Sequence, residues 1–109
     1  MQPYVLAFNG SPRKGGNTEL LLASAIEGVK KTGASVETVA VNDLDFLPCQ
    51  NCGYCTRHGV CRLADKDDMG KVYESMERAT HFLAASPVYF ASVSAQLKAL
   101  IDRCQSYWA

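Results

Sequence analysis

The fold is decided near the N-terminus, by the stretch Val5-Leu6-Ala7-Phe8-Asn9-Gly10-Ser11-Pro12-Arg13-Lys14-Gly15-Gly16-Asn17-Thr18. Four apolar residues run into a loop of small, polar and basic residues, and a helical pattern begins at Asn17. The first backbone N–H groups of a helix have no partner within it, and the helix dipole adds partial positive charge there. A phosphate suits such a place, so the stretch predicts a strand, an anion-binding loop and a helix. The alternative is an ordinary βα turn in which the glycines only serve geometry.

Composition places the chain among globular proteins. It has 109 residues, of which 48% are hydrophobic and 20% charged, and 11 basic side chains balance 11 acidic ones. This is the size of one domain, and zero net charge predicts neither a nucleic-acid nor a membrane partner. No apolar run approaches the roughly 18 residues of a membrane span, and no leader is recognisable, so we expect a cytoplasmic protein. In that reducing compartment the five cysteines would be thiols or metal ligands.

Hydrophobic periodicity predicts an alternating α/β chain. Strands are expected at residues 4–8, 35–41 and 81–86. Helices are expected at residues 18–31, after the acidic residues Asp65, Asp67 and Asp68, and after Ser92 as N-cap. The expected buried faces of these helices comprise Leu21, Leu22, Ala25, Ile26 and Val29; Met69, Val72, Tyr73 and Met76; and Val93, Gln96, Leu97, Leu100, Ile101 and Cys104.

The character of the strands predicts their order. The first is apolar throughout, which is typical of a central parallel strand, whereas Glu37 and Thr38 mark the second as an edge strand. Together with the element order, this predicts a flavodoxin-like doubly wound parallel sheet with strand order 2-1-3. The ligand crevice of such a sheet opens between strands one and three, where the loops after Phe8 and Ser86 emerge. A phosphate loop and an aromatic loop are therefore expected to converge.

Two motifs in this order resemble a known family. The sequence NGSPRKGGNT at residues 9–18 is similar to the flavin-phosphate loop of the NAD(P)H-dependent FMN reductase family, and SPVYFASVSAQLK at residues 86–98 is similar to its second flavin loop. The compact cysteine run between them resembles the iron–sulfur flavoprotein branch. The resemblance implies that the FMN phosphate is held by Ser11, Arg13, Asn17 and Thr18. It also implies that the ring and ribityl chain are bordered by Pro87, Tyr89, Phe90 and Ser92.

The cysteine run at residues 49–61 has the spacing C-x2-C-x2-C-x5-C, formed by Cys49, Cys52, Cys55 and Cys61. Spacing this short wraps three thiolates round one corner of an iron–sulfur cluster, and the resemblance favours [4Fe-4S]. Structural zinc usually takes two C-x-x-C pairs with a longer spacer, but zinc and free or partly oxidised thiols are the alternatives. We expect the run to be a loop, His58 to be a loop residue rather than a ligand, and Cys104 to be a small core residue.

The resemblance implies an FMN-dependent oxidoreductase that moves electrons from NAD(P)H or a ferredoxin-type donor through FMN to a small acceptor. Such chemistry needs no catalytic acid–base pair, and none is predicted. A non-enzymatic flavodoxin-like electron carrier and an inactive or metal-binding interaction module are the alternatives. Residues 1–109 are expected to form an incomplete flavodoxin-like FMN-binding domain without its later strands. Strand three would then be a bare edge, which predicts a homo-oligomer.

Overall fold

The structure is a computed structural model that describes residues 2–108. Its elements, in chain order, are β1 (Tyr4–Asn9), α1 (Asn17–Lys30), β2 (Ser35–Ala40), the 3-10 turn η1 (Val41–Asp43), α2 (Tyr54–His58), α3 (Met69–Arg78), β3 (His81–Ala85), α4 (Ala95–Asp102) and α5 (Gln105–Trp108). All three expected strands and all three expected helices are present. The boundaries of the strands and of α1 agree with the sequence prediction to within one residue.

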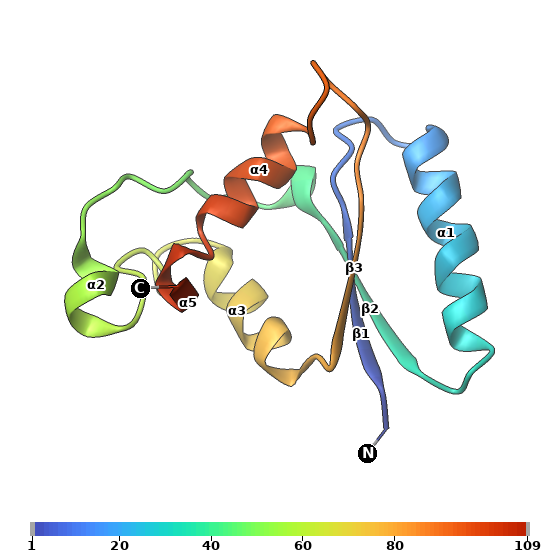
Figure 1. The fold of residues 1–109 in the computed structure, drawn as a ribbon, viewed down its shortest axis with the longest axis horizontal. Helices are drawn as coiled ribbons and strands as arrows, with labels where there is room; N and C mark the ends of the chain where they lie inside the picture. The colour runs from blue at the N-terminus through green and yellow to red at the C-terminus, as the bar shows by residue number, and fades with distance from the viewer. Residues whose placement is uncertain (1, 109) are drawn as a thin grey trace.

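The strands form a parallel sheet in the order β2-β1-β3, as the sequence predicts. Phe8 in the central strand lies opposite Val39 of β2 and Ala84 of β3. Helix α1 covers one face of the sheet, while α3 and α4 cover the other, and the short helices α2 and α5 lie beyond them (Figure 1). This is the doubly wound, flavodoxin-like α/β arrangement.

The core lies mainly between the sheet and the two helices α3 and α4. Side chains alternate along β1, so Leu6 and Phe8 enter this layer, whereas Val5 and Ala7 point to the α1 side. All four are at most 7% exposed, which confirms a central strand covered on both faces. The main cluster of buried residues comprises Leu6, Phe8, Val39, Val41, Met69, Val72, Leu97 and Leu100. Tyr73, Met76 and Cys104 pack against it, as expected.

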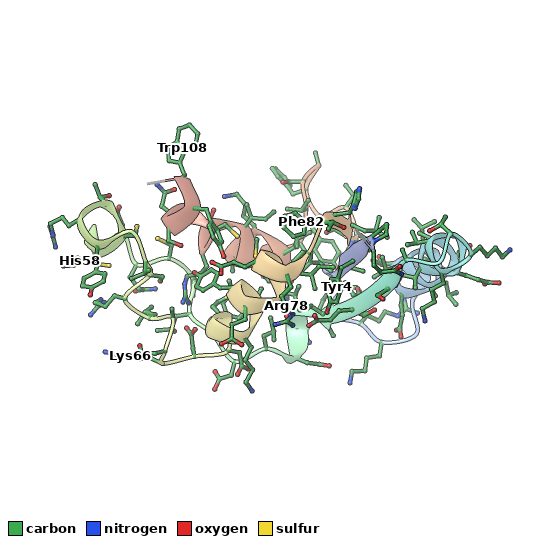
Figure 2. The ribbon with its side chains drawn as sticks, turned by 90° about the horizontal axis from the view of Figure 1, so that it is seen from below. Tyr4, His58, Lys66, Arg78, Phe82 and Trp108 are labelled. Atoms are coloured by element: carbon green, nitrogen blue, oxygen red, sulfur yellow. The ribbon has the colours of Figure 1, made fainter. Side chains whose placement is uncertain are left out.

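Glu37 interrupts the apolar pattern of β2 because it joins three elements. Its carboxylate accepts hydrogen bonds from the Tyr4 hydroxyl (2.5 Å) and the Ser75 hydroxyl (2.8 Å). The Arg78 guanidinium lies 3.6 Å away, and Figure 2 shows Tyr4 and Arg78 on neighbouring elements. The hydrogen bond from Tyr4, aided by Ser75 and Arg78, outweighs partial burial and holds the pKa of Glu37 below its ordinary value.

Two helical faces differ from the prediction. Helix α4 begins at Ala95 with Ser94 as its N-cap, so the expected cap at Ser92 is wrong. Val93 therefore precedes the helix and is 37% exposed, and Ile101 is 46% exposed. On α1, the three positions Leu22, Ile26 and Val29 form the inward stripe, while Leu21 and Ala25 are exposed. Neighbouring residues on a helix point in directions about 100° apart. A sheet of three strands covers only one narrow stripe of the helix surface, so Leu21 and Ala25 lie outside it.

The sequence predicted that the cysteine run is a loop. The structure differs, because the run contains the five-residue helix α2. Gly53 and Gly59 flank this helix with φ angles of 76° and 75°. Glycine adopts such angles without the steric penalty of a Cβ, so the chain can turn sharply into and out of the helix. None of the five residues is buried. Hydrophobic periodicity therefore could not reveal the helix.

Strand β3 is exposed along one side. It pairs with β1, and on its other side it has no paired strand among residues 2–108. Phe82 on this strand is 58% exposed, and Figure 2 labels its side chain. The expected self-association stays a prediction. Among the helices of residues 2–108, none combines the length and apolar character that a membrane crossing needs.

The inward stripe of α1 can be tested with two neighbouring leucines. Leu22→Ala should lower the free energy of unfolding by about 2–3 kcal/mol, because it leaves a cavity at a residue that is 3% exposed. Leu21→Ala changes a side chain that is 69% exposed and should stay within about 0.5 kcal/mol of the wild type. Urea unfolding of both variants measures the difference. Equal losses would contradict the assigned stripe.

The Glu37 contacts predict a pH dependence of stability. A carboxylate whose pKa is lowered by folding stabilises the protein above its unfolded pKa of about 4.3, and this contribution is lost as the pH falls through the lowered value. Glu37→Gln should therefore be less stable than the wild type at neutral pH, and the difference should narrow in acid. Tyr4→Phe removes the first hydrogen-bond donor to Glu37. In a Tyr4→Phe background, the stability lost through Glu37→Gln should therefore depend less on pH. Urea titrations at several pH values measure it, and a constant difference contradicts the assignment.

Candidate functional site

The loop after β1 is folded by its own side chains. The Asn9 side chain accepts a hydrogen bond from the Ser11 N–H (3.0 Å), and the Ser11 hydroxyl accepts one from the Arg13 N–H (3.1 Å). Gly15 adopts a φ angle of 71°, which an L side chain rarely tolerates. The Arg13 side chain packs over Gly16, since a Cβ built at Gly16 would lie 3.5 Å from Arg13 Nε. The guanidinium is therefore directed toward the start of α1.

The start of α1 leaves backbone donors available. Within residues 2–108, no side chain caps its N-terminus at Gly16. Asn17 is exposed and Thr18 is half-buried, so both predicted phosphate-binding residues lie at the accessible first turn. Glu19, which the sequence prediction missed, turns back and accepts a hydrogen bond from the Gly15 N–H (2.5 Å). A carboxylate oxygen thus already occupies one donor of the loop, as an anionic ligand would.

The aromatic loop after β3 is a tight turn. Tyr89 and Ser92 exchange backbone hydrogen bonds of 3.0 and 3.1 Å across Phe90 and Ala91. Phe90 and Ala91 have φ angles of 49° and 62°, which are unfavourable for residues with a Cβ. Phe90 is fully exposed and Tyr89 is 49% exposed, while Pro87 is half-buried. Strain combined with exposed aromatic rings is typical of a ligand-binding loop.

Ser94 joins the two loops, and the sequence prediction missed its role. Its hydroxyl donates to the Gly10 carbonyl (2.5 Å) and accepts from the Leu97 N–H (3.2 Å), while its N–H donates to the Ser86 hydroxyl (2.9 Å). The Gly10 N–H in turn donates to the Ala85 carbonyl (2.8 Å). A Cβ on Gly10 would lie only 3.0 Å from Leu97 Cβ, so glycine permits this close approach. The expected convergence of the two loops is present.

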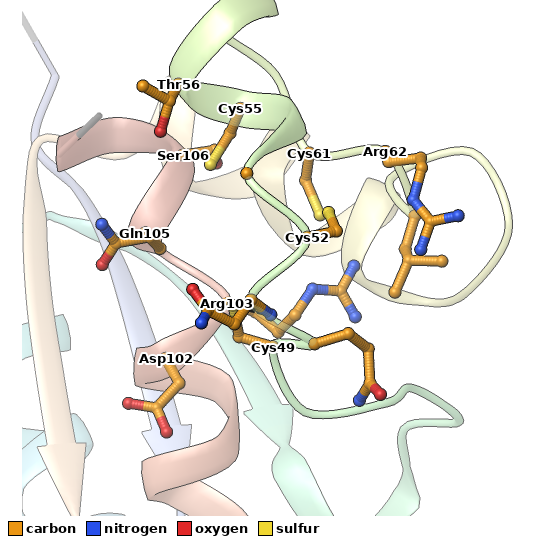
Figure 3. A pocket seen from close by; sticks show the side chains of 14 residues that line it. Cys49, Cys52, Cys55, Thr56, Cys61, Arg62, Asp102, Arg103, Gln105 and Ser106 are labelled. Atoms are coloured by element: carbon orange, nitrogen blue, oxygen red, sulfur yellow. Dashed lines mark hydrogen bonds between the residues drawn. The ribbon is translucent and has the colours of Figure 1, made fainter.

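The four cysteines of the run line one pocket of about 320 Å³. Figure 3 shows Cys52 and Cys61 next to one another, with Cys49 and Cys55 further along the pocket wall. The ends of α4 and α5 close the opposite side with Asp102, Arg103, Gln105 and Ser106. Within residues 2–108, no three His, Cys, Asp or Glu side chains are close enough to hold one metal ion. The sulfurs therefore surround a common space without converging on one point.

Hydrogen-bond donors lie close to two of the pocket cysteines. The Asn51 N–H lies 3.5 Å from Cys49 Sγ. A hydrogen bond from the Tyr54 backbone, helped by Arg62, lowers the pKa of the Cys52 thiol. Outside the pocket, burial raises the pKa of Cys104. His58 stacks on the ring of Tyr54 (3.9 Å between centroids) and is absent from the pocket lining.

An ion pair that the sequence prediction missed adjoins the cysteines. Arg103 is 2% exposed, and its guanidinium lies 2.7 Å from the Asp67 carboxylate. Burial alone would raise the pKa of Asp67, but hydrogen bonds from Arg103 and from the Met69 N–H hold it below its ordinary value. Burial and the neighbouring Cys61 raise the pKa of Tyr73 to about 12. A signal for Arg103 existed, because it follows Leu97 and Leu100 at steps of three along the buried face.

Comparison with known proteins identifies the family of the chain. The family described as NADPH-dependent FMN reductase matches residues 3–109. An iron-sulfur flavoprotein of Methanosarcina thermophila is 39% identical over 99 residues, which are 91% of this chain and 51% of the relative. Another, of Archaeoglobus fulgidus, is 38% identical over 102 residues, which are 94% of this chain and 51% of the relative. The chain thus spans about half the length of these relatives, and the resemblance to iron–sulfur flavoproteins is confirmed.

Two solved structures share the fold. An apo NADH:FMN oxidoreductase named EMOB has a TM-score of 0.69 at 22% identity, covering 94% of this chain and 50% of that one. RosB, solved with bound 8-demethyl-8-formylriboflavin-5'-phosphate, has a TM-score of 0.73 at 18% identity, covering 94% of this chain and 42% of that one. At these identities the similarity supports the flavodoxin-like fold alone.

The strained turn can be tested by removing a methyl group. Ala91→Gly should raise the free energy of unfolding by about 0.5–1 kcal/mol, because the relieved left-handed strain of about 1–2 kcal/mol exceeds the entropy that glycine loses on folding. Ala99→Gly, inside α4, is the matched control and should lower it by about 0.5–1 kcal/mol. Thermal and urea unfolding measure both. A destabilised Ala91→Gly variant would show that the turn is unstrained.

Proposed function

Because this chain belongs to the NADPH-dependent FMN reductase family, we propose that it forms the FMN-binding part of an oxidoreductase. The enzyme takes electrons from NAD(P)H or a ferredoxin-type donor and delivers them to a small acceptor. The observation that carries this proposal is the junction at Ser94, which joins an anion-binding loop to an aromatic loop at the ends of β1 and β3. A flat ring linked to a phosphate by a polar chain matches these two loops in both shape and charge.

The residues present fit FMN. The uncapped first turn of α1 offers N–H groups to the phosphate, and the Glu19 carboxylate on the Gly15 N–H, in the loop just before the helix, supports an oxygen anion at this position. Ser11, Arg13, Asn17 and Thr18 would hold the phosphate. Pro87, Tyr89, Phe90 and Ser92 would border the ring and exclude water from one side of it. When bound, FMN supplies hydride acceptance and the release of single electrons.

We extend the proposal to an iron–sulfur cluster, [4Fe-4S], held by Cys49, Cys52, Cys55 and Cys61. Four soft sulfur donors line one space of about 320 Å³, and such donors suit iron–sulfur clusters and zinc. Because the sulfurs do not converge, loading requires the run to tighten around the metal. None of the five cysteines of residues 2–108 is paired in a disulfide, and we place the protein in the cytoplasm, where thiols stay available as metal ligands.

Flavin titration tests the assigned loops. Arg13→Ala should weaken FMN binding about tenfold or more, because it removes a charge-assisted contact to phosphate, and should leave riboflavin, which has no phosphate, unchanged. Phe90→Ala should weaken both ligands about two- to tenfold, since it removes ring contact. Glu19→Gln should strengthen FMN binding only, because a negative charge leaves the phosphate site. Quenching of flavin fluorescence measures each dissociation constant.

Lys30→Ala, at the opposite end of α1, is the matched control for loss of a basic side chain and should bind both flavins as the wild type does. A wild-type chain that binds FMN no more tightly than riboflavin contradicts the phosphate loop. Equal effects of Arg13→Ala on the two flavins would contradict the role of that residue while leaving the aromatic loop in place.

A further inference from the structure

The most unusual polar group outside the flavin loops is the side chain of Arg103. It follows α4 and turns back into the protein, where Nη1 donates to the Leu47 carbonyl (2.7 Å). Nη1 and Nη2 also donate to the two carboxylate oxygens of Asp67, at 2.7 and 3.2 Å. The guanidinium is planar, so three hydrogen bonds at its end fix the orientation of the whole group. Arg103 therefore places a positive charge at one defined position.

The third nitrogen of this guanidinium, Nε, has no hydrogen-bond partner among the described residues. Arg103 Nε is buried, and no acceptor within residues 2–108 reaches it. Arg103 nevertheless lines the pocket of the four cysteines, and Figure 3 shows its guanidinium on the side of Cys52 and Cys61. A buried donor without a partner is costly, because it has lost its hydrogen bonds to water. Such a group indicates a ligand or a functional charge rather than a contribution to stability.

The charge of the expected occupant explains this arrangement. A divalent metal with four thiolates carries two negative charges, and so does an oxidised [4Fe-4S] cluster with four thiolates. One-electron reduction of the cluster adds a third. A nearby fixed cation stabilises all these states, and it stabilises the reduced cluster most. Asp67 holds the Nη1 and Nη2 end of the guanidinium, and Nε forms no hydrogen bond with the described residues.

We propose that Arg103 is a positioning residue of the cysteine pocket, whose fixed positive charge favours an anionic metal–thiolate centre and raises its one-electron reduction potential. This inference rests on the proposed use of the four cysteines as metal ligands. Asp67 has the opposite electrostatic effect, although it belongs to the same ion pair. A purely structural role predicts instead that loss of either partner disturbs the pocket in the same way.

Two substitutions that remove opposite charges separate these roles. Arg103→Gln and Asp67→Asn each break the ion pair, but one removes a positive charge and the other a negative one. Arg103→Lys retains the charge without the Nε donor. The full chain is reduced anaerobically and loaded either with Co²⁺ or with ferrous iron and sulfide. Absorption of the Co²⁺–thiolate complex reports affinity, and a dithionite titration followed by electron paramagnetic resonance reports the cluster potential.

Arg103→Gln should weaken Co²⁺ binding about tenfold and lower the cluster potential by about 59 mV, which is a tenfold change for a one-electron couple. Asp67→Asn should shift both quantities in the opposite direction, and Arg103→Lys should lie nearer the wild type than Arg103→Gln does. Shifts of the same sign in Arg103→Gln and Asp67→Asn, or wild-type values in Arg103→Gln, would overturn the role of Arg103. A wild-type chain that takes up neither Co²⁺ nor a cluster would contradict the cysteine site itself.

Discussion

The hydrogen bond from the Ser94 hydroxyl to the Gly10 carbonyl is the constraint that holds the two candidate flavin-binding loops together. The bond is buried, since Ser94 is 0% exposed, and a buried polar group that loses its partner is costly. Ser94 also begins α4 and contacts the loop after β3. One side chain therefore fixes three things together: the exit of β1, the aromatic loop and the first turn of a helix. The spacing between the two loops follows from packing in the core.

Much of this fold was predictable because its signals are local. The unbroken apolar run of β1 and the polar interruption at Glu37 gave the strand order correctly. The errors lie where tertiary contacts override a local pattern. Ser92 and Ser94 are equally good N-caps by residue type, and only the contact with Gly10 selects Ser94. Leu21 is as apolar as Leu22, but only one of them can face a sheet of three strands.

The residues of the candidate sites also fall into those that local sequence motifs reveal and those that only tertiary contacts bring together. Residues such as Arg13 and Phe90 lie in contiguous loop motifs, and the meeting of the two loops at Gly10 and Ser94 could be anticipated from the order of the strands. Their binding roles stay predictions until flavin is titrated. Arg103 and Asp67 are separated by 35 intervening residues and meet only in the folded chain. The helical spacing from Leu97 through Leu100 marks Arg103 as buried, but nothing in the sequence names its partner. The return of Glu19 to Gly15 was equally invisible.

Helix α4 connects the two candidate sites, with Ser94 before its first residue and Arg103 after its last. Nine helical steps separate these residues by roughly 13 Å along the axis. Inserting or deleting a single residue would rotate Arg103 by about 100° and shift it by about 1.5 Å, which would withdraw it from Asp67. The number of residues between positions 94 and 103 is therefore constrained, because it sets the distance and the angle between the two candidate sites.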